Sequence, residues 1–350
     1  MSTSPRFTVV MACHQTASYL SKSLDSVSRQ TFADFDAICY VEESTDGSLE
    51  ICRDHAAKDL RFKVVSAPKS GAVATTRNYG IDHADGEYIV VLDGDDWLEL
   101  DALAKIDAKL RAVGNVDVLS FAASATESED TRNAQRISNF TSSDESGAFS
   151  GAEAIRRAGR NGGRMGNYTW LSAYRTAFLR ASGVRQSDGV LMEDFESTPR
   201  IWFAAKKFAY LDDALYVYRR RPGSLTTEAS PRIAIDIARQ FRSLADFAAN
   251  SSAPDDILKI WGNQWISTLY WFLFHPVTSK KVSNADRRRA LDILTAGNGI
   301  QLFKKTASRA SLPKRVAIPL VLLAAKGWQF PAKLYFRKLY YPLVERRSKG

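Results

Sequence analysis

Short apolar runs alternate with amphipathic segments over the first 120 residues of the chain. The apolar runs are rich in β-branched residues and predict buried strands at 7–13, 36–41, 62–67, 87–93 and 116–121. The segments between them space their apolar residues as helices do, at 17–30, through 49–52, at 72–83 and at 101–112. Strands buried on both faces and separated by helices predict a mostly parallel sheet with helices on either side. The ligand crevice of such a sheet lies beyond the carboxyl ends of its strands.

Two later regions depart from this alternation. Residues 122–150 are dominated by Ser, Thr, Asn, Asp and Glu and predict a surface loop or hairpin, either touching a ligand or clear of it. After about Thr227 the pattern is helical to the end. The aromatic segment 261–274 contains Trp261, Trp265 and Tyr270, whose rings can line an acceptor groove or, as we favour, pack in a core.

Length and composition indicate a folded chain of about two domains. It has 350 residues, of which 45% are apolar and 25% charged. Its three cysteines, an odd number without metal-like spacing, argue against a disulfide framework or a zinc site, and we expect core thiols in a reducing compartment. The first residues do not resemble a signal peptide, and no apolar run reaches the roughly 20 residues that cross a bilayer.

The net charge of +9 is concentrated in the tail. Residues 301–350 contain twelve Lys or Arg and one acidic residue, Glu345, so the first 300 residues are close to neutral. This distribution disfavours nucleic-acid binding by the main fold. The tail 316–349 combines basic and aromatic residues. This pattern suits an anionic membrane surface and, equally, a helical core or dimer contact.

The sharpest local feature is Asp93-Gly94-Asp95-Asp96 at the exit of a predicted strand. Neighbouring carboxylates repel one another, so this arrangement predicts a compensating divalent cation, and hard oxygen ligands suit Mg²⁺ or Mn²⁺. The alternative is a solvated acidic turn in which Asp96 caps a helix.

Two other clusters follow predicted strands. In the loop after 36–41, Glu43 can accept hydrogen bonds from a nucleotide, or the loop simply caps the next helix through Ser44 and Asp46. In the segment 70–78, Gly71 permits a tight turn and Arg77 can reach a phosphate, a base or one of the acidic loops as an ion pair.

Two motifs lie further along the chain. Glu193 and Asp194 are flanked by large apolar residues, so Asp194 is a candidate general base, although such a pair also commonly starts a helix. Arg219 and Arg221 can clamp a diphosphate with their forked donors, or they belong to a solvated basic turn.

Taken in order, these segments resemble the family 2 inverting glycosyltransferases with the GT-A fold, a Rossmann-like nucleotide-diphospho-sugar transferase fold. The resemblance covers residues 5–226 and runs through VVMACHQTASYLSKSLDSVSRQTF, VEESTDGS, SGAVATTRNYGI, DGEYIVVLDGDDWL, YTWLSAYRTAFL, MEDFE and YRRRPGSLT. It implies a GT-A domain at 5–226 and a helical C-terminal region at 227–350.

The resemblance also implies roles for individual residues. Asp93 and Asp95 match the ends of the family's DXD motif, with Asp96 completing a metal-binding loop. Glu43 matches the acid that binds the nucleotide base, and Arg77 matches an Arg of the same pocket. Asp194 matches the general base of the family's ED motif, with Glu193 beside it.

The sequence departs from the family pattern around the base pocket. The first strand of the family usually ends in Pro-x-Tyr-Asn, whereas Ala12-Cys13-His14-Gln15 stands here and lacks the expected aromatic ring. Ala12 and His14, at the positions of this motif, are expected to contribute to binding of the nucleotide-sugar donor. The usual Asp-Asp-Gly-Ser is replaced by Glu42-Glu43-Ser44.

The resemblance implies a metal-dependent inverting transferase acting in cell-surface polysaccharide synthesis. It would move a sugar from a nucleotide-diphosphate donor, most often UDP in this family, to a hydroxyl of a glycan or lipid-linked acceptor. The signature of processive synthases is absent, which favours a non-processive enzyme, cytoplasmic or peripheral at the inner face of the membrane. The alternatives are an inactive glycan- or nucleotide-sugar-binding module and a nucleotidyltransferase.

Overall fold

A computed structural model describes residues 4–160, 165–221, 230–274 and 279–297. The chain forms two compact units, each described here by itself. The first unit consists of Met1–Arg157, Gly166–Val190 and Ser197–Arg221, and the second of Ala158–Met165, Leu191–Glu196 and Pro222–Gly350. The domain boundary expected at residue 226 and the basic tail 316–349 lie outside the described residues.

The first part of the chain follows the predicted alternation of strands and helices. Its elements are β1 (Phe7–Cys13), α1 (Ala17–Ser28), β2 (Phe35–Glu42), α2 (Ser48–Ala56), β3 (Phe62–Ala67), α3 (Ala74–His83) and β4 (Tyr88–Asp93). β1 pairs in parallel with both β2 and β4, and β2 pairs in parallel with β3. Successive residues Val9, Val10 and Met11 are fully buried, as expected of a strand covered on both faces.

The remaining elements of the first unit complete the sheet, and α5 and α7 run on from one unit into the other. They are β5 (Trp97–Leu98), α4 (Ala102–Val113), β6 (Val118–Thr126), β7 (Gln135–Ile137), η1 (Ser142–Asp144), α5 (Gly151–Gly159), η2 (Thr169–Leu171), β8 (Ser172–Arg175), α6 (Thr176–Ser182), α7 (Asp194–Ala204) and β9 (Phe208–Arg219).

Within the described residues, nine strands form one sheet in the order β3-β2-β1-β4-β8-β6-β9-β5, with β7 paired to β6. β8 lies antiparallel between β4 and β6, β9 runs parallel to β6, and β5 is antiparallel to β9. The prediction of a mostly parallel sheet flanked by helices is confirmed. The sequence pattern did not indicate β8 or β9.

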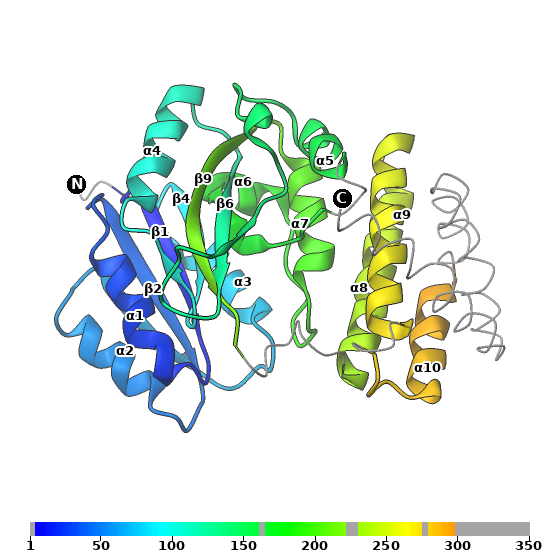
Figure 1. The fold of residues 1–350 in the computed structure, drawn as a ribbon, viewed down its shortest axis with the longest axis horizontal. Helices are drawn as coiled ribbons and strands as arrows, with labels where there is room; N and C mark the ends of the chain where they lie inside the picture. The colour runs from blue at the N-terminus through cyan, green and yellow to red at the C-terminus, as the bar shows by residue number, and fades with distance from the viewer. Residues whose placement is uncertain (1–3, 161–164, 222–229, 275–278, 298–350) are drawn as a thin grey trace. The chain divides into compact units, whose positions relative to one another are not determined.

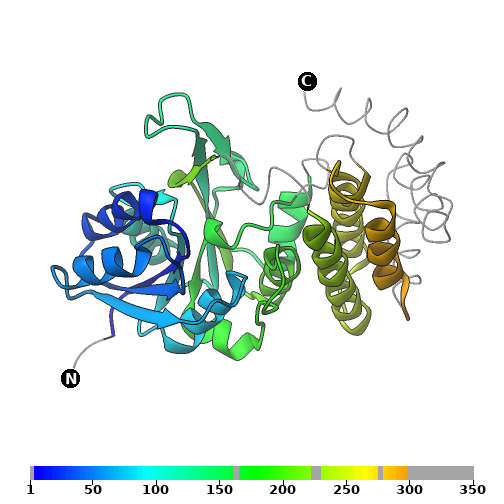
Figure 2. The same cartoon turned by 90° about the horizontal axis from the view of Figure 1, so that it is seen from below.

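The helices cover both faces of this sheet (Figures 1 and 2). α1 and α2 contact each other on one face, and α3 contacts α6 on the opposite face. The crossover connections between parallel strands are right-handed. The chain crosses the sheet in one direction from β1 to β3 and then returns past β1 to β4, so α3 lies on the face opposite to α1 and α2. Because β1, β2 and β4 run parallel, their carboxyl ends share one edge of the sheet.

The polar stretch 122–150 contains a hairpin, one of the two forms expected for it. β7 pairs antiparallel with the end of β6. In the connection between them, Glu129 approaches Lys22 of α1 at 3.5 Å and Arg219 of β9 at 3.7 Å. The hairpin connection therefore reaches the same edge of the sheet as the carboxyl ends of the strands.

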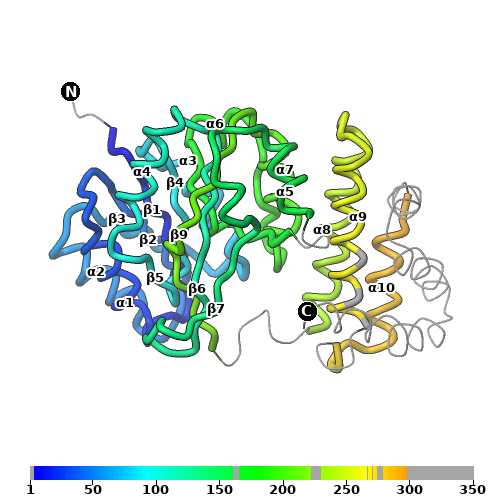
Figure 3. The backbone as a smooth tube through the Cα atoms, turned by 45° about the horizontal axis from the view of Figure 1, so that its top comes forward, coloured from blue at the N-terminus to red at the C-terminus, as the bar shows by residue number. Residues whose placement is uncertain are grey.

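The second unit is helical in its described part. α8 (Pro231–Asn250) contacts α9 (Asp255–Leu269), the π-helical turn η3 (Tyr270–Phe274) and α10 (Asn284–Thr295), and Figure 3 traces the three α-helices beside one another. Ser230 caps α8 with Pro231 behind it, and Ser283 forms a capping box with Asp286 at the start of α10. In the described ranges, no helix is long and apolar enough to cross a membrane.

The buried aromatic and sulfur side chains agree with the expectations for a core. Trp261 and Trp265 are 0% and 4% exposed, so both pack in the interior of the second unit rather than lining an open groove. The three cysteines, Cys13, Cys39 and Cys52, are buried free thiols of the first unit. Cys39 lies with its Sγ 3.9 Å from the Sδ of Met11 on the neighbouring strand.

Candidate nucleotide-sugar site

The acidic loop after β4 is fixed against the neighbouring strand. Asp93, the last residue of β4, is the register partner of Ala12 in β1, and the amide of Gly94 donates to the carbonyl of Ala12 at 2.9 Å. A Cβ on Gly94 would lie 2.9 Å from that carbonyl oxygen and 2.9 Å from Oγ1 of Thr16. Position 94, between the two acids, is therefore restricted to glycine, because its backbone lies so close to Ala12 and Thr16.

Asp96 anchors this loop to β9. Its Oδ2 accepts a hydrogen bond from the hydroxyl of Tyr216 at 2.6 Å, and its Oδ1 accepts one from the amide of Arg219 at 2.7 Å. Burial raises the pKa of Asp96 well above its ordinary value, and the charges of Asp95 and Asp93 raise it further. At 1% exposure and with both oxygens engaged, Asp96 is suited to holding the loop rather than to binding a cation.

Asp93 and Asp95 are each matched with an arginine. Nη2 of Arg77 donates to Oδ1 of Asp93 at 3.3 Å, and Nε of Arg221 donates to Oδ2 of Asp95 at 2.7 Å. Burial raises the pKa of Asp93, with Arg77 acting in the opposite direction. Arg77 is thus in an ion pair with the acidic loop, one of the alternatives left open by its spacing.

Arg219 and Arg221 converge on the same loop over an aromatic ring of α1. Nε of Arg219 donates to the carbonyl of Asp95 at 3.0 Å. The guanidinium groups of Arg219 and Arg221 lie 4.9 Å and 5.6 Å from the ring centroid of Tyr19, and Arg219 also lies 4.8 Å from that of Trp97. Aromatic faces favour cations at this range, so they hold both guanidinium groups near the acidic loop.

His14 lies just beyond the end of β1 and is partly buried. Its Nδ1 is buried and has no hydrogen-bond partner among the residues that the structure describes, and the same is true of Oγ1 of Thr16, which is 5% exposed. Buried polar atoms normally have a hydrogen-bond partner. A bound molecule or a water near Ala12 and Asp93 can therefore form hydrogen bonds with these two atoms.

The neighbouring carboxylates of Glu42 and Glu43 differ in their surroundings. Glu42 is buried at the end of β2 and accepts hydrogen bonds from the amide and the hydroxyl of Ser70. Glu43 is exposed at the same edge of the sheet, one strand away from β1. Glu42 therefore holds the segment before α3, and Glu43 is the acid open to solvent.

The predicted caps of α2 are partly right. Oδ1 of Asp46 accepts from the amide of Ser48, the first residue of α2, at 3.1 Å, and its Oδ2 accepts from the amide of Ala17, the first residue of α1, at 2.9 Å. Ser44 instead donates its hydroxyl to Asp46 at 2.8 Å. Its expected capping role is wrong, because the carboxylate outcompetes the hydroxyl as an acceptor.

Glu193 and Asp194 belong to the second unit. Asp194 is the first residue of α7, and Glu193, 4% exposed, directly precedes it. This position satisfies the helix-start alternative and leaves the catalytic role of Asp194 as a prediction, because carboxylates are also stabilised at helix N-termini.

Sequence reasoning missed the aromatic residues that support the site. The hydroxyl of Tyr216 bonds to Asp96 and also accepts from the amide of Asp93 at 3.2 Å. The ring of Trp170 stacks on Tyr216, with centroids 4.5 Å apart. The alternating pattern of LYVYR at 215–219 was a strand signal that would have placed Tyr216 and Tyr218 on one face of β9.

The carboxylates fit a hard divalent cation only in part. In the described ranges, no three His, Cys, Asp or Glu side chains converge as a complete cation site. Asp93 and Asp95, with side chains 28% and 21% exposed, supply two hard oxygen donors. Mg²⁺ and Mn²⁺ often take the rest of their ligands from water and substrate phosphates, so two protein carboxylates suit them.

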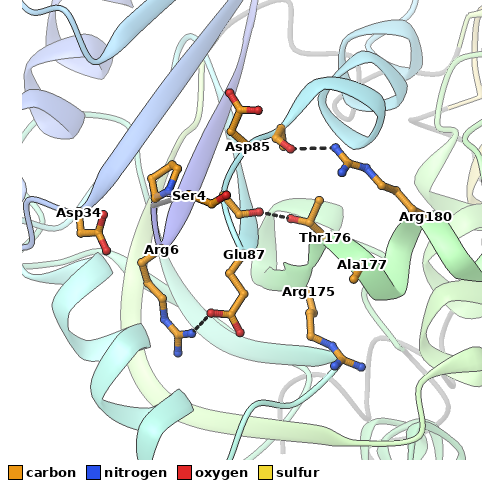
Figure 4. A pocket seen from close by; sticks show the side chains of 12 residues that line it. Ser4, Arg6, Asp34, Asp85, Glu87, Arg175, Thr176, Ala177 and Arg180 are labelled. Carbon is orange, nitrogen blue, oxygen red and sulfur yellow. Dashed lines mark hydrogen bonds and ion pairs between the residues drawn. The ribbon is translucent and has the colours of Figure 1, made fainter. Parts of the chain in front are cut away.

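A separate pocket of about 580 Å³ lies at the opposite, amino-terminal edge of the sheet (Figure 4). Two arginines of its lining, Arg6 and Arg180, have hydrogen-bond or ion-pair partners. Arg6 pairs with Glu87, and Arg180 donates to the carbonyls of Ile81 and Ala84 at 2.7 and 2.8 Å. Nε of Arg175, which lines this pocket, is also buried and has no hydrogen-bond partner among the described residues, so such atoms occur at both edges of the sheet.

Comparison with known proteins identifies the family of the chain. The family model "Glycosyl transferase family 2" matches residues 8–181, which include β1 to β4, the acidic loop and β8. The chain belongs to glycosyltransferase family 2. The matched region contains Glu43, Arg77, Asp93 and Asp95, and it ends before Asp194 and Arg219.

The family relatives are distant in sequence. Glycosyltransferase GlyA of Streptococcus pneumoniae serotype 4 is 26% identical over 242 residues, 63% of this chain and 31% of GlyA. EpsH of Bacillus subtilis is 27% identical over 218 residues, 61% of each chain. The chain thus spans less than two thirds of either relative.

Solved structures share the fold. TarS residues 1–349 of S. aureus, in complex with UDP-GlcNAc, superposes with a TM-score of 0.74 at 18% identity, covering 95% of this chain and 92% of TarS 1–349. A mannosyltransferase of Pyrobaculum calidifontis, in complex with GDP-Man and Mn²⁺, has a TM-score of 0.52 at 18% identity, covering 93% and 88%. The expected GT-A fold with a helical C-terminal region is confirmed.

Proposed function

We propose that this family 2 glycosyltransferase transfers a sugar from a UDP-sugar to a hydroxyl of a glycan or lipid-linked acceptor in cell-surface polysaccharide synthesis. The observation that carries the proposal is the convergence of Asp93, Asp95, Arg77 and Arg221 at the carboxyl edge of the parallel strands. That edge is where α/β sheets bind nucleotides. The UDP-GlcNAc complex of a protein with the same fold supports UDP as the nucleotide.

The donor would be held by charge and by the sheet edge together. Asp95, supported by Asp93, would hold Mn²⁺ or Mg²⁺, which when bound acts as a Lewis acid toward the departing diphosphate. Arg219 and Arg221 lie over Tyr19 with forked donors that match phosphate oxygens. Glu43 would accept from the nucleotide base, and Arg77, Ala12 and His14 would line the same pocket.

Asp194 would act as the general base, with Glu193 beside it. Its carboxylate takes the proton of the acceptor hydroxyl while the oxygen attacks the anomeric carbon from the face opposite the diphosphate. The bond to the nucleoside diphosphate breaks as the new C–O bond forms, so the anomeric configuration inverts. General-base assistance of this kind contributes about 10² to 10⁴ in rate.

Donor binding is tested first by thermal-shift screening of UDP-, GDP-, TDP- and CMP-sugars with and without Mn²⁺. A ligand that binds only the folded state raises the melting temperature, so a UDP-sugar should give a shift that requires Mn²⁺. Asp95→Ala should abolish the Mn²⁺-dependent shift. Asp85→Ala, at the amino-terminal edge of the sheet, is the matched control and should retain it. A wild-type protein that responds to no nucleotide sugar contradicts the proposal.

The base is tested by UDP release from the donor so identified. Asp194→Asn should bind UDP as the wild type does and lose at least 10²-fold in turnover. Asp246→Asn, a half-exposed Asp of α8 paired with Arg242, is the control. Normal turnover by Asp194→Asn would remove this residue from the base role.

Peripheral attachment through 316–349 stays a prediction, to be tested by flotation with anionic vesicles.

A further inference from the structure

The segment that carries Glu193 and Asp194 is fastened to α8 at three points. Residues Leu191–Glu196 group with the helices of the second unit rather than with the sheet. Polar or aromatic contacts tie Leu191, Phe195 and Glu196 to side chains spaced along α8. The segment that contains the candidate base is thus held by a helix of the expected C-terminal region 227–350, outside the expected GT-A domain.

The first contact involves Asp236, a buried carboxylate in the N-terminal part of α8. Its Oδ2 accepts the backbone amide of Leu191 at 3.2 Å, and the residue is 1% exposed. Arg239 donates to its Oδ1 at 3.0 Å, and Arg232 lies 3.4 Å from Oδ2. Both arginines belong to the same helix and form ion pairs with Asp236, and a charge-assisted hydrogen bond to an amide is stronger than a neutral one.

The backbone that Asp236 holds is strained. Met192, directly after Leu191, has a φ of +63°, a left-handed conformation that residues with a side chain rarely adopt. Such a conformation persists only where neighbouring contacts enforce it, and strain of this kind concentrates at functional sites. Glu193 and Asp194 follow immediately, so the turn at Met192 sets their direction.

The other two contacts lie after the acidic pair. The ring of Phe195 meets Phe241 of α8 edge-on, with centroids 6.2 Å apart, and Phe272 in the same manner at 6.4 Å. Oε1 of Glu196 accepts from the hydroxyl of Ser243 at 3.0 Å. Glu193 and Asp194 are therefore bracketed by contacts to α8 on both sides.

We propose that Asp236 is a positioning residue for Asp194 and that α8 is part of the catalytic apparatus, an inference that rests on the proposed role of Asp194 as general base. Asp236 fixes the amide of Leu191, this contact maintains the left-handed turn at Met192, and the turn orients the carboxylate of Asp194. A displacement of about 1 Å at a reacting group can reduce turnover about 10²-fold. The helical unit would thus contribute to the chemistry without touching the substrate.

The test combines a local and a kinetic measurement on the full chain. Asp236→Asn should raise hydrogen–deuterium exchange at least tenfold in the peptide 187–196. It should also lower kcat for UDP release at least tenfold, while KM for the donor and the affinity for UDP change less than twofold. Asp236→Glu, which restores the charge, should recover part of kcat. Asp246→Asn on the same helix should alter neither exchange in 187–196 nor kcat.

The outcomes separate this inference from the proposed function. Unchanged exchange in Asp236→Asn overturns the anchor, and raised exchange with normal kcat overturns the positioning role. Should Asp236→Asn not fold, Ser243→Ala removes one anchor on Glu196 and should lower kcat twofold to fivefold at unchanged KM; an unaltered kcat overturns the proposal. If Asp194→Asn turns over normally, the base assignment fails and the positioning role of Asp236 fails with it, even where raised exchange in 187–196 shows that Asp236 holds the segment.

Discussion

Replacing Tyr216 by Phe tests how the acidic loop is held. The substitution keeps the ring that stacks on Trp170 and removes only the hydroxyl. That hydroxyl donates to Oδ2 of Asp96 at 2.6 Å and accepts from the amide of Asp93 at 3.2 Å. Asp96 would keep a single donor, the amide of Arg219.

The expected loss of stability follows from these contacts. A hydrogen bond to a charged group contributes about 1.5–3 kcal/mol, and a buried amide left without an acceptor costs about 1 kcal/mol more. Asp96 is 1% exposed, so water is poorly placed to substitute for the hydroxyl. We therefore expect Tyr216→Phe to lower the free energy of unfolding by about 2–4 kcal/mol at neutral pH.

The same reasoning predicts a pH dependence. Burial, followed by the charges of Asp95 and Asp93, raises the pKa of Asp96, and the Tyr216 hydrogen bond opposes this. When folding raises the pKa of a carboxyl, the free energy of unfolding of the protein falls as the pH rises through the folded-state pKa. Removing the Tyr216 hydroxyl makes this fall larger. A protonated Asp96 needs fewer donors, so the difference between variant and wild type should shrink as the pH is lowered through the raised pKa of Asp96.

Urea unfolding at several pH values measures the effect, and Tyr210→Phe on the same strand is the matched control. The hydroxyl of Tyr210 donates to Asp212 at 2.6 Å, but that side chain is 25% exposed and also pairs with Arg136. Water can replace the missing donor there, so the control should lose about 1 kcal/mol. Equal losses in the two variants, or a Tyr216→Phe penalty that does not vary with pH, would refute the anchoring role of this hydroxyl.

Three further substitutions probe the site and the helical unit. Gly94→Ala places a Cβ 2.9 Å from the carbonyl of Ala12, and should cost about 1–3 kcal/mol and weaken Mn²⁺–UDP binding about tenfold by calorimetry. Burial acts to raise the pKa of Asp46, but hydrogen bonds led by the amide of Ala17 lower it to about 2. Asp46→Asn should therefore cost about 1 kcal/mol at pH 7, allowing for solvent screening, and its melting temperature should approach that of the wild type as the pH falls from 4 to 2. Gln240→Met should raise the melting temperature, because both polar atoms of this buried amide have no partner in the structure; a lower value would reveal a bound water.

The sequence predicted the parallel half of the sheet closely. β1 and β3 begin and end where expected, at Phe7–Cys13 and Phe62–Ala67. Dense β-branched runs bounded by polar loops leave little freedom there. β8 was missed because it spans only Ser172–Arg175 and follows the 3₁₀ turn at Thr169–Leu171 directly. Four residues are too few to show the alternation of apolar and polar side chains that identifies a strand. Its antiparallel insertion between β4 and β6 is a tertiary choice that local pattern does not encode.

The site was predictable to the extent that its residues carry charge. Asp93, Asp95, Arg77 and Arg221 are charged residues at or soon after the ends of strands or in the helix that follows one, and they do meet at one edge. The inward turn of Asp96 was not foreseeable, because it depends on Tyr216, which is 120 residues away in the sequence. The contact between Asp236 and Leu191 is equally non-local, and a lone Asp on an amphipathic helix gives no signal of such a role.

The pairing of Asp93 with Arg77 and of Asp95 with Arg221 has a consequence for how the donor arrives. Each guanidinium already neutralises one carboxylate, and a divalent metal combined with a diphosphate is itself nearly neutral. Loading the site is then an exchange of partners in which cation meets carboxylate and arginine meets phosphate, with little change in total charge. Donor affinity should accordingly vary only weakly with ionic strength, unlike binding driven by long-range attraction.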